Sequence, residues 1–260
     1  MNYTIFISSA DSYSDLWPIF FDLFKMHWPD FKRNIYLNTE VKDFYHEGLN
    51  ITCTKVGKLG SFGKTFRAGL KKVPMEDVML IMIDYLFMGP VNILKLTEYF
   101  KFFKKENLDT LCLVHQNYRE IGNTINADLE RVIPPSKDMF SFQIAFWNKS
   151  TLYEMTLPHE NPWASEWFGT RRANKMKIKL ACLSRNAQRP ILYDLAGCLH
   201  KGKWLQSAID YLNIRGYNNI EFEKRGLYEE VPNSLKDRIK VKWMLIKCGL
   251  MGSYWDLLLR

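Results

Sequence analysis

The stretch Asp77-Val-Met-Leu-Ile-Met-Ile-Asp-Tyr-Leu-Phe87 decides the fold. Its residues from Val78 to Ile83 are apolar and uncharged, a run that is too short to span a membrane and that predicts a strand buried on both faces. The run ends at a carboxylate, Asp84, which Tyr85 follows. In open α/β sheets ligands bind at the carboxyl ends of such strands, so Asp84 is a candidate to hold a divalent cation or to lie beside a phosphate. The alternative is a strand-end aspartate that caps a turn.

The composition indicates one large domain, or one domain with an appendage. The chain has 260 residues, of which 47% are hydrophobic and 15% aromatic, enough to bury a sizeable core. The formal charge of +8 favours anionic partners but does not by itself choose between nucleotide phosphates, acidic lipids and nucleic acid. The five cysteines form no CxxC pair, which favours reduced thiols in the cytoplasm. Neither a signal peptide nor a membrane span is predicted.

Strand-like and helical segments alternate along the chain, which predicts the α/β class. Besides the central strand, we expect strands at about 3–7, 34–38, 51–56, 110–114, 142–147 and 191–194. We expect helices at about 14–27, 64–72, 92–103 and 163–175.

A glycine-rich loop, Gly57-Lys-Leu-Gly-Ser-Phe-Gly-Lys-Thr65, precedes one of these helices. It resembles a P-loop in position, but the P-loop spacing places Lys58 where the first glycine should stand. Because the amides of such a loop must converge on one phosphate, an error of one residue matters. Ser61 and Lys64 remain candidates for a phosphate contact at the start of the helix.

The segment Glu160-Asn-Pro-Trp-Ala-Ser-Glu-Trp-Phe-Gly169 contains a candidate general base. Glu166 lies early in a helix among aromatic side chains, which raise the pKa of a carboxylate and suit it to take a proton. The alternative is ordinary, because acids are favoured near the start of a helix.

The segment Gly197-Cys-Leu-His-Lys-Gly-Lys-Trp204 collects His200, Lys201 and Lys203 in one short loop. Such side chains can neutralise a diphosphate leaving group, and the glycines allow the backbone to approach it. The alternative is a solvated turn with surface lysines.

Taken together, these segments resemble the sugar-nucleotide-dependent glycosyltransferases with the GT-A fold, in particular the bacterial enzymes of surface-polysaccharide assembly. The resemblance covers most of residues 3–205. It is carried by Ile7-Ser-Ser-Ala-Asp-Ser-Tyr13, Tyr36-Leu-Asn-Thr-Glu40, Leu80-Ile-Met-Ile-Asp-Tyr-Leu-Phe87, Phe142-Gln-Ile-Ala-Phe-Trp147, Asn161-Pro-Trp-Ala-Ser-Glu166 and His200-Lys-Gly-Lys-Trp204.

The resemblance implies a mixed, mostly parallel central sheet flanked by helices over residues 1–205, and a helical C-terminal segment over 206–260. It implies transfer of a sugar from a nucleotide-sugar donor to a hydroxyl of a glycan or lipid-linked acceptor, with inversion, in capsule or lipopolysaccharide biosynthesis. Glu166 would be the base, beside Trp163 on the acceptor side, and Asp84 would face the donor diphosphate. The other donor-binding residues would be Ser8, Ser9, Asp11, Ser61, Lys64, Tyr85, His200, Lys201 and Lys203.

The metal-binding motif of such enzymes usually has two acids, and here Ile83 precedes Asp84 without a second acid nearby. A site for Mn²⁺ or Mg²⁺ at Asp84 and a metal-independent reaction are therefore both kept as expectations. Two other functions also stay open, a P-loop-like nucleotide phosphotransferase and a non-catalytic nucleotide-sugar-binding protein.

The C-terminal segment from about Leu235 to Arg260 interleaves basic residues with tryptophan and leucine. This pattern suits a helix that lies in an anionic membrane interface, which would place the protein in the cytoplasm at the inner face of the plasma membrane. The alternative is a helix that packs on the sheet domain or on a second subunit, so an oligomer stays open. No nucleic-acid partner is expected.

Overall fold

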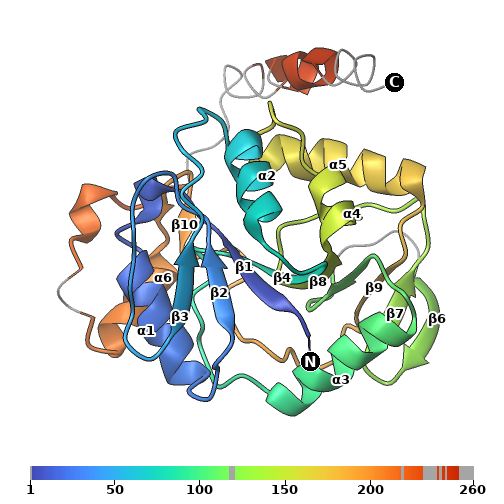
Figure 1. Cartoon of the computed structure of the whole chain (residues 1–260), viewed down its shortest axis with the longest axis horizontal. Helices are drawn as coiled ribbons and strands as arrows, with labels where there is room; N and C mark the ends of the chain where they lie inside the picture. The colour runs from blue at the N-terminus through green and yellow to red at the C-terminus, as the bar shows by residue number, and fades with distance from the viewer. Residues whose placement is uncertain are drawn as a thin grey trace.

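The computed structural model describes residues 2–116, 121–217, 220–230, 239, 242–243 and 245–251. Within these residues one nine-stranded sheet has the order β3–β2–β1–β4–β8–β5–β9–β7–β6 (Figure 1). Its strands are β1 (Thr4–Ser8), β2 (Asn34–Leu37), β3 (Asn50–Cys53), β4 (Asp77–Met82), β5 (Thr110–Cys112), β6 (Ile121–Asn126), β7 (Leu129–Val132), β8 (Ala145–Asn148) and β9 (Leu180–Leu183). A separate two-stranded ribbon pairs β10 (Leu199–His200) with β11 (Lys203–Trp204).

The sheet is mixed and mostly parallel in its centre. β1 pairs in parallel with β2 and β4, β2 with β3, and β5 with β9. β8 lies antiparallel between β4 and β5, and β7 and β6 extend the far edge in antiparallel fashion. Because β8 opposes both of its neighbours, β4 and β5 run in the same direction, and the predicted mixed, mostly parallel sheet is confirmed.

Helices cover both faces of the sheet (Figure 1). They are α1 (Trp17–His27), α2 (Phe62–Lys72), α3 (Ile93–Lys105), α4 (Lys149–Glu154), α5 (Pro162–Met176) and α6 (Gln206–Ile214), with short 3-10 turns η1 (Asp11–Tyr13) and η2 (Phe222–Lys224). In the view of Figure 1, α2, α4 and α5 lie above the sheet, whereas α1 and α3 lie below it. Side chains of Ser61, Asn92, Asn148 and Asn161 cap four of the helices at their N-termini, each worth about 1 kcal/mol.

The central strand behaves as its sequence predicts. The four side chains from Val78 to Ile81 in β4 are completely buried, between β1 on one side and β8 on the other. Aromatic pairs join the sheet to its helices: Tyr3, just before β1, contacts Phe100 of α3 at 4.9 Å between ring centroids, and Phe6 of β1 contacts Phe66 of α2 at 5.5 Å. The site that follows β4 therefore rests on a rigid element.

The prediction of a strand at residues 191–194 is wrong. These residues form an irregular segment. Ile191 and Tyr193 are buried while Leu192 is 37% exposed, and this alternation imitates a strand. Instead of joining the sheet, the segment runs beside the loop after β4, where Met88 N donates to Leu192 O and Asn92 N donates to Pro190 O, both at 2.8 Å.

The residues after 205 continue the same packed structure at first. Tyr211 of α6 donates its hydroxyl to Phe87 O at 2.9 Å, and Tyr228 N donates to Trp204 O at 2.8 Å. Contacts therefore cross residue 205, and the division of the chain at this residue stays a prediction.

The last described residues, 245–251, are helical through Gly249, and Figure 1 shows this helix on the side of α5, where Gly249 lies near Phe168. The remaining parts of the predicted C-terminal helix, 235–238, 240–241, 244 and 252–260, lie outside the described residues.

Candidate active site

A cavity of about 490 Å³ opens at the carboxyl ends of β1 and β4. Parallel strands end at one edge of a sheet, which brings the residues after β1 next to those after β4. We call this cavity the central cavity. Its wall includes Ser8, Tyr13, Asp84, Glu166, His200 and Lys201. Three segments that are far apart in the sequence, and that sequence analysis singled out separately, therefore meet here.

Asp84 lies on the floor of the central cavity, and burial raises the pKa of its carboxyl from 3.8 to about 6. The loop after residue 193 closes over it, since Cys198 N donates to Asp84 O at 2.8 Å. Gly197 has a φ of +79°, and a Cβ on this residue would lie 2.9 Å from Asp84 Oδ2. Glycine is thus needed at 197 for its backbone conformation and for its close approach to the carboxylate.

The surroundings of Asp84 fit a divalent cation only in part. Within the described chain, no group of three metal-ligating side chains includes Asp84. Mg²⁺ is nevertheless often held by one or two carboxylates together with substrate phosphates. Asp84 would thus hold a cation that a diphosphate helps to bind, which is the only metal chemistry that this donor set supports.

Glu166 is held in place by the start of α5. Asn161 caps the helix by accepting from Ala164 N at 2.8 Å, and Pro162 provides its first residue. Glu166 Oε1 accepts from Phe142 N at 2.9 Å. Burial raises the pKa of Glu166 above its usual value, although the Phe142 amide partly opposes this. A carboxylate in this state has one oxygen fixed by the backbone and a raised basicity, as a general base requires.

A buried ion pair supports the loop that leads into α5. Glu160 is 1% exposed, and Arg172 donates to both of its oxygens at 2.8 and 2.7 Å. Glu160 also accepts from Leu157 N at 2.9 Å. Bidentate pairing of this kind fixes geometry, so the loop 157–160 and α5 are held together as one unit.

The tight turn between β10 and β11 forms another part of the cavity lining. Lys201 and Gly202 both have positive φ, at 50° and 80°, as the favoured two-residue hairpin turn requires. Arg225 fastens this turn, because it donates to Gly202 O at 3.3 Å and to Ser12 O at 2.8 Å. Burial and the neighbouring Lys201 lower the pKa of His200, which favours a neutral imidazole at neutral pH. Among the described residues that line the cavity, Lys201 is the one lysine or arginine.

Two serines that follow the first strand have different surroundings. Ser9 Oγ accepts from Trp17 Nε1 at 2.8 Å, so this hydroxyl holds α1. Ser8 is 1% exposed and lines the cavity, and within the described residues its Oγ has no hydrogen-bond partner. A buried hydroxyl of this kind is a natural partner for a polar atom of a ligand.

A second hollow, which we call the tryptophan groove, adjoins the central cavity. Its volume is about 920 Å³, and it shares Trp163 and Glu166 with that cavity. Trp163 and Trp167 are 53% and 52% exposed, and the Arg171 guanidinium lies 5.1 Å from the Trp167 ring centroid. The other wall includes Gln116, Lys137, Asp138, Ser141 and Gln143. Glu166 therefore stands where the two hollows meet.

The glycine-rich loop does not form a phosphate cradle. Gly63 N donates to Glu160 O at 3.0 Å, and Thr65 N donates to Ser61 O at 3.1 Å. A Cβ on Gly63 would lie 2.0 Å from Leu157 O, so this glycine permits close packing of α2 against the loop 157–160. The amides that a P-loop would offer to a phosphate are used within the protein, and the structure argues against a P-loop here.

The other predicted site residues are spread over different places. Tyr85 lines the central cavity, and its ring contacts that of Tyr193 in a tilted arrangement, with 4.7 Å between centroids. Asp11 lies outside the lining, and its carboxylate accepts from the backbone N–H groups of residues 40–42 at 2.9–3.1 Å. Ser61 donates to Pro158 O at 2.6 Å as it caps α2. The exposed lysines Lys64 and Lys203 also lie outside the lining.

Sequence reasoning missed Tyr13, Phe62 and Phe142 as cavity residues, and it missed Trp167 and Arg171 in the groove. A signal for the last two existed. Trp163, Trp167 and Arg171 are four residues apart and so share one face of α5.

The chain matches no protein-family profile, and no curated protein matches its sequence. Solved structures do share its fold. S. aureus TarS 1–349 in complex with UDP matches with a TM-score of 0.51 and 16% identity over 72% of this chain. The chain spans 59% of the length of that structure. TarS is a glycosyltransferase of the GT-A type. The chain has a GT-A-like fold.

Two further structures match at lower TM-scores. An active-site mutant of LgtC matches at 0.47, with 12% identity over 90% of this chain and 99% of its own. An apo UDP-glucose pyrophosphorylase matches at 0.49, with 10% identity over 84% of this chain and 100% of its own. The fold resemblance expected from the sequence is confirmed by TarS, and the choice of reaction depends on the side chains of the site.

Proposed function

We propose that the protein is a glycosyltransferase that moves a sugar from a nucleotide-sugar donor to a hydroxyl group of a glycan or lipid-linked acceptor. One observation carries the proposal. Glu166, a partly buried carboxylate of raised pKa, stands at the junction of two hollows that together offer room for a donor and an acceptor. A base placed between two substrate sites is what transfer to a hydroxyl needs.

The central cavity suits the donor. Its volume of about 490 Å³ is within the range of pockets that bind small ligands, and it lies at the strand ends where open α/β sheets bind nucleotides. UDP is bound by TarS, which supports a nucleoside diphosphate in the same place here. The unpaired Ser8 Oγ and the Lys201 ammonium would form hydrogen bonds with oxygen atoms of this nucleoside diphosphate.

The tryptophan groove suits the acceptor. Exposed tryptophan rings offer flat apolar faces to the C–H groups of sugar rings, while Asp138, Ser141 and Gln143 supply hydrogen bonds to hydroxyl groups. Trp163 forms part of both hollows, so an acceptor that lies on it would bring its hydroxyl to Glu166.

The reaction then follows from these positions. Glu166 takes the proton of the acceptor hydroxyl, and the oxygen attacks the anomeric carbon of the donor sugar. The bond from this carbon to the diphosphate oxygen breaks, and the nucleoside diphosphate leaves with the electron pair. If Glu166 acts from the face of the sugar opposite the leaving group, the transfer gives inversion, which is the outcome that we propose.

The leaving group needs positive charge, and Lys201 provides it. His200 has a lowered pKa, so its role is that of a neutral hydrogen-bonding partner. Asp84 can lie beside a diphosphate in two ways, by holding a divalent cation or by carrying a proton, and its raised pKa lowers the cost of protonation. The chemistry that a bound Mn²⁺ or Mg²⁺ would supply is neutralisation of the departing diphosphate.

A role in surface-polysaccharide assembly at a membrane is the finer part of the proposal. No helix formed by the described residues is long and apolar enough to cross a membrane. The C-terminal helix exposes Ile239, Trp243, Ile246 and Leu250 at helical spacing, with exposed Lys242 beside them. An apolar stripe with lysines at its border suits the surface of an anionic bilayer, where lipid-linked acceptors would be found.

The test replaces the base while preserving its shape. We expect Glu166→Gln to lower release of nucleoside diphosphate from nucleotide sugars by about a hundredfold or more, because the amide cannot accept the proton. Thermal shift with the same nucleotide sugars should show unchanged donor binding. The activity of the unaltered protein should fall on acidification through the raised pKa of Glu166, since only the carboxylate is a base.

Glu154→Gln, at an exposed position, is the matched control and should leave the rate unchanged. Near-normal turnover in Glu166→Gln would remove Glu166 from the mechanism. Donor binding without turnover in the unaltered protein, over a broad panel of acceptors, would favour the non-catalytic binding protein instead.

A further inference from the structure

The register of three strands brings side chains of metal-binding type together on one face of the sheet, away from Asp84. Cys182 of β9 pairs directly with Glu130 of β7 on one side and with Cys112 of β5 on the other. Residues that pair directly across strands project from the same face. A carboxylate and two thiols therefore form a row across β7, β9 and β5.

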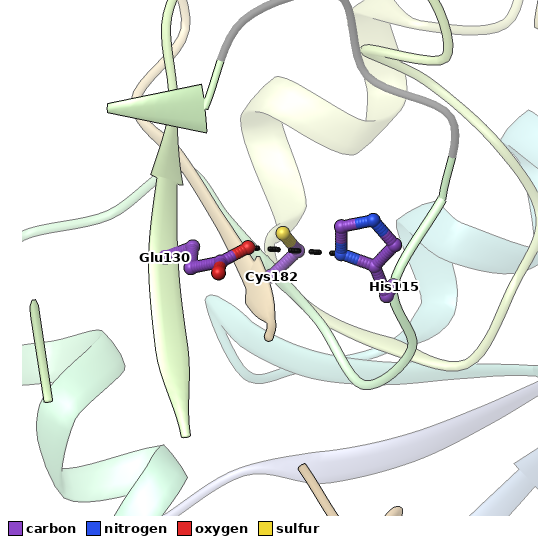
Figure 2. Close-up of side chains that lie close together, drawn as sticks. All are labelled: His115, Glu130 and Cys182. Carbon is purple, nitrogen blue, oxygen red and sulfur yellow. Dashed lines mark ion pairs between the residues drawn. The ribbon is translucent and has the colours of Figure 1, made fainter. Parts of the chain in front are cut away.

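His115 completes the group from the segment that follows β5. Its Nδ1 lies 3.7 Å from Glu130 Oε2, and one ligand atom from each of His115, Glu130 and Cys182 lies within 4.8 Å of the other two. Figure 2 shows the Cys182 sulfur beside the line that joins the imidazole to the carboxylate. The three side chains point toward a common centre, although they come from three different segments of the chain.

The separation between His115 Nδ1 and Glu130 Oε2 is closer to that of two ligands of one ion than to that of a direct hydrogen bond. A distance of 3.7 Å between nitrogen and oxygen exceeds the range of a hydrogen bond. Tetrahedral zinc with bonds of about 2.0–2.3 Å to nitrogen, oxygen and sulfur separates its ligand atoms by roughly 3.3–3.6 Å. Glu130 and His115 therefore need to move by only a few tenths of an ångström to share one ion.

We propose that His115, Glu130 and Cys182 bind one Zn²⁺ ion. A set of one nitrogen, one oxygen and one sulfur ligand suits zinc, whereas Mg²⁺ and Ca²⁺ prefer oxygen ligands alone. Coordination uses the Cys182 thiolate, so loading releases the thiol proton to solvent. His115 Nδ1 also lies 3.2 Å from Leu183 O, and a proton that it shares with this carbonyl would be displaced by the ion as well.

The ion would have a structural role, because it would link β7, β9 and the segment after β5, which leads to one wall of the tryptophan groove. Gln116, next to His115, donates to Ser141 Oγ at 2.7 Å, and both residues line the groove. Glu130 and Cys182 belong to β7 and β9 on the far side of β5 from β4, so the ion is separate from any cation at Asp84. Loading would therefore stabilise the fold and the groove without entering the reaction.

The test uses Co²⁺ as a spectroscopic substitute for zinc in the full chain after removal of metals with a chelator. We expect binding of one Co²⁺ per chain, with a near-ultraviolet thiolate-to-cobalt charge-transfer band, and displacement by Zn²⁺ with loss of the band. Cys182→Ser should abolish the band. Cys53→Ser, in β3 at the other end of the sheet, should leave it unchanged. An unaltered band in Cys182→Ser would overturn the proposal.

A second variant keeps the test decisive if Cys182→Ser does not fold. Glu130→Gln should retain the band while it weakens binding of Zn²⁺ about tenfold or more, because one charged ligand is lost. Zn²⁺ should also raise the melting temperature of the unaltered chain and raise it less in Glu130→Gln. Equal Zn²⁺ affinity in the two proteins, or no binding of either metal at micromolar concentrations, would overturn the proposal.

Discussion

Replacement of Asp84 by asparagine should stabilise the protein at pH 8. The carboxyl of Asp84 has its pKa raised from 3.8 to about 6, and burial is the leading cause. A raised carboxyl pKa means that the folded state binds the proton more tightly than the unfolded state does. This favourable contribution is fully present below about pH 4 and is lost as the pH rises through about 6. The neutral amide of the Asp84→Asn variant would not carry this penalty at high pH.

The size of this penalty follows from the pKa shift of Asp84. About two pKa units at about 1.4 kcal/mol each correspond to a penalty of up to about 3 kcal/mol at pH 8. For a chain of this size, about 3 kcal/mol corresponds to a change in melting temperature of about 6–12 °C as an upper range. The measurement is the difference in melting temperature between Asp84→Asn and the unaltered protein at pH 4 and at pH 8.

We expect this difference to grow in favour of the variant between pH 4 and pH 8. Asp30→Asn, at an exposed position, is the control and should show a difference that does not depend on pH. A difference for Asp84→Asn that stays constant over this range would show that the carboxylate is solvated or compensated, and it would refute the reasoning.

Two predictions concern metal and membrane. Because no second acid adjoins Asp84 in the sequence, and because Lys201 also lines the cavity, EDTA should reduce sugar transfer only in part, and addition of Mn²⁺ should restore it. Complete loss would mean that Asp84 binds a cation far better than its surroundings indicate. The full chain should sediment with anionic vesicles at low salt and be released by high salt. Trp243→Ser should weaken this binding, whereas Leu94→Ser, on α3 and 84% exposed, should not. Equal binding of the two variants, or none by the unaltered protein, would contradict the membrane proposal.

The sequence predicted best what depends on local pattern. The apolar run before Asp84 marks a strand buried on both faces, and Asn161-Pro162 marks the start of the helix that carries Glu166. These features need only neighbouring residues, because burial period and helix capping are local properties. The same pattern misleads at residues 191–194, where alternate burial arises from contact with a loop rather than from a sheet.

Features that depend on contacts between distant segments could not be predicted. Gly63 looks like part of a phosphate loop, yet its missing side chain makes room for Leu157 O, nearly a hundred positions away. The need for glycine at 197 likewise becomes clear only from its close approach to the Asp84 carboxylate. The group of His115, Glu130 and Cys182 depends on the order of β5, β9 and β7, which no spacing within the sequence reveals.

The contact between His159 and the C-terminal helix has a geometric consequence. His159 Nε2 lies 3.1 Å from Cys248 O. His159 stands two residues before Asn161, which caps α5. The exposed stripe of the C-terminal helix and the tryptophan face of α5 are therefore attached to the same short loop, which the pair of Glu160 and Arg172 makes stiff. A surface that binds the stripe would therefore be coupled, through this loop, to the helix that carries Glu166 and the two exposed tryptophans.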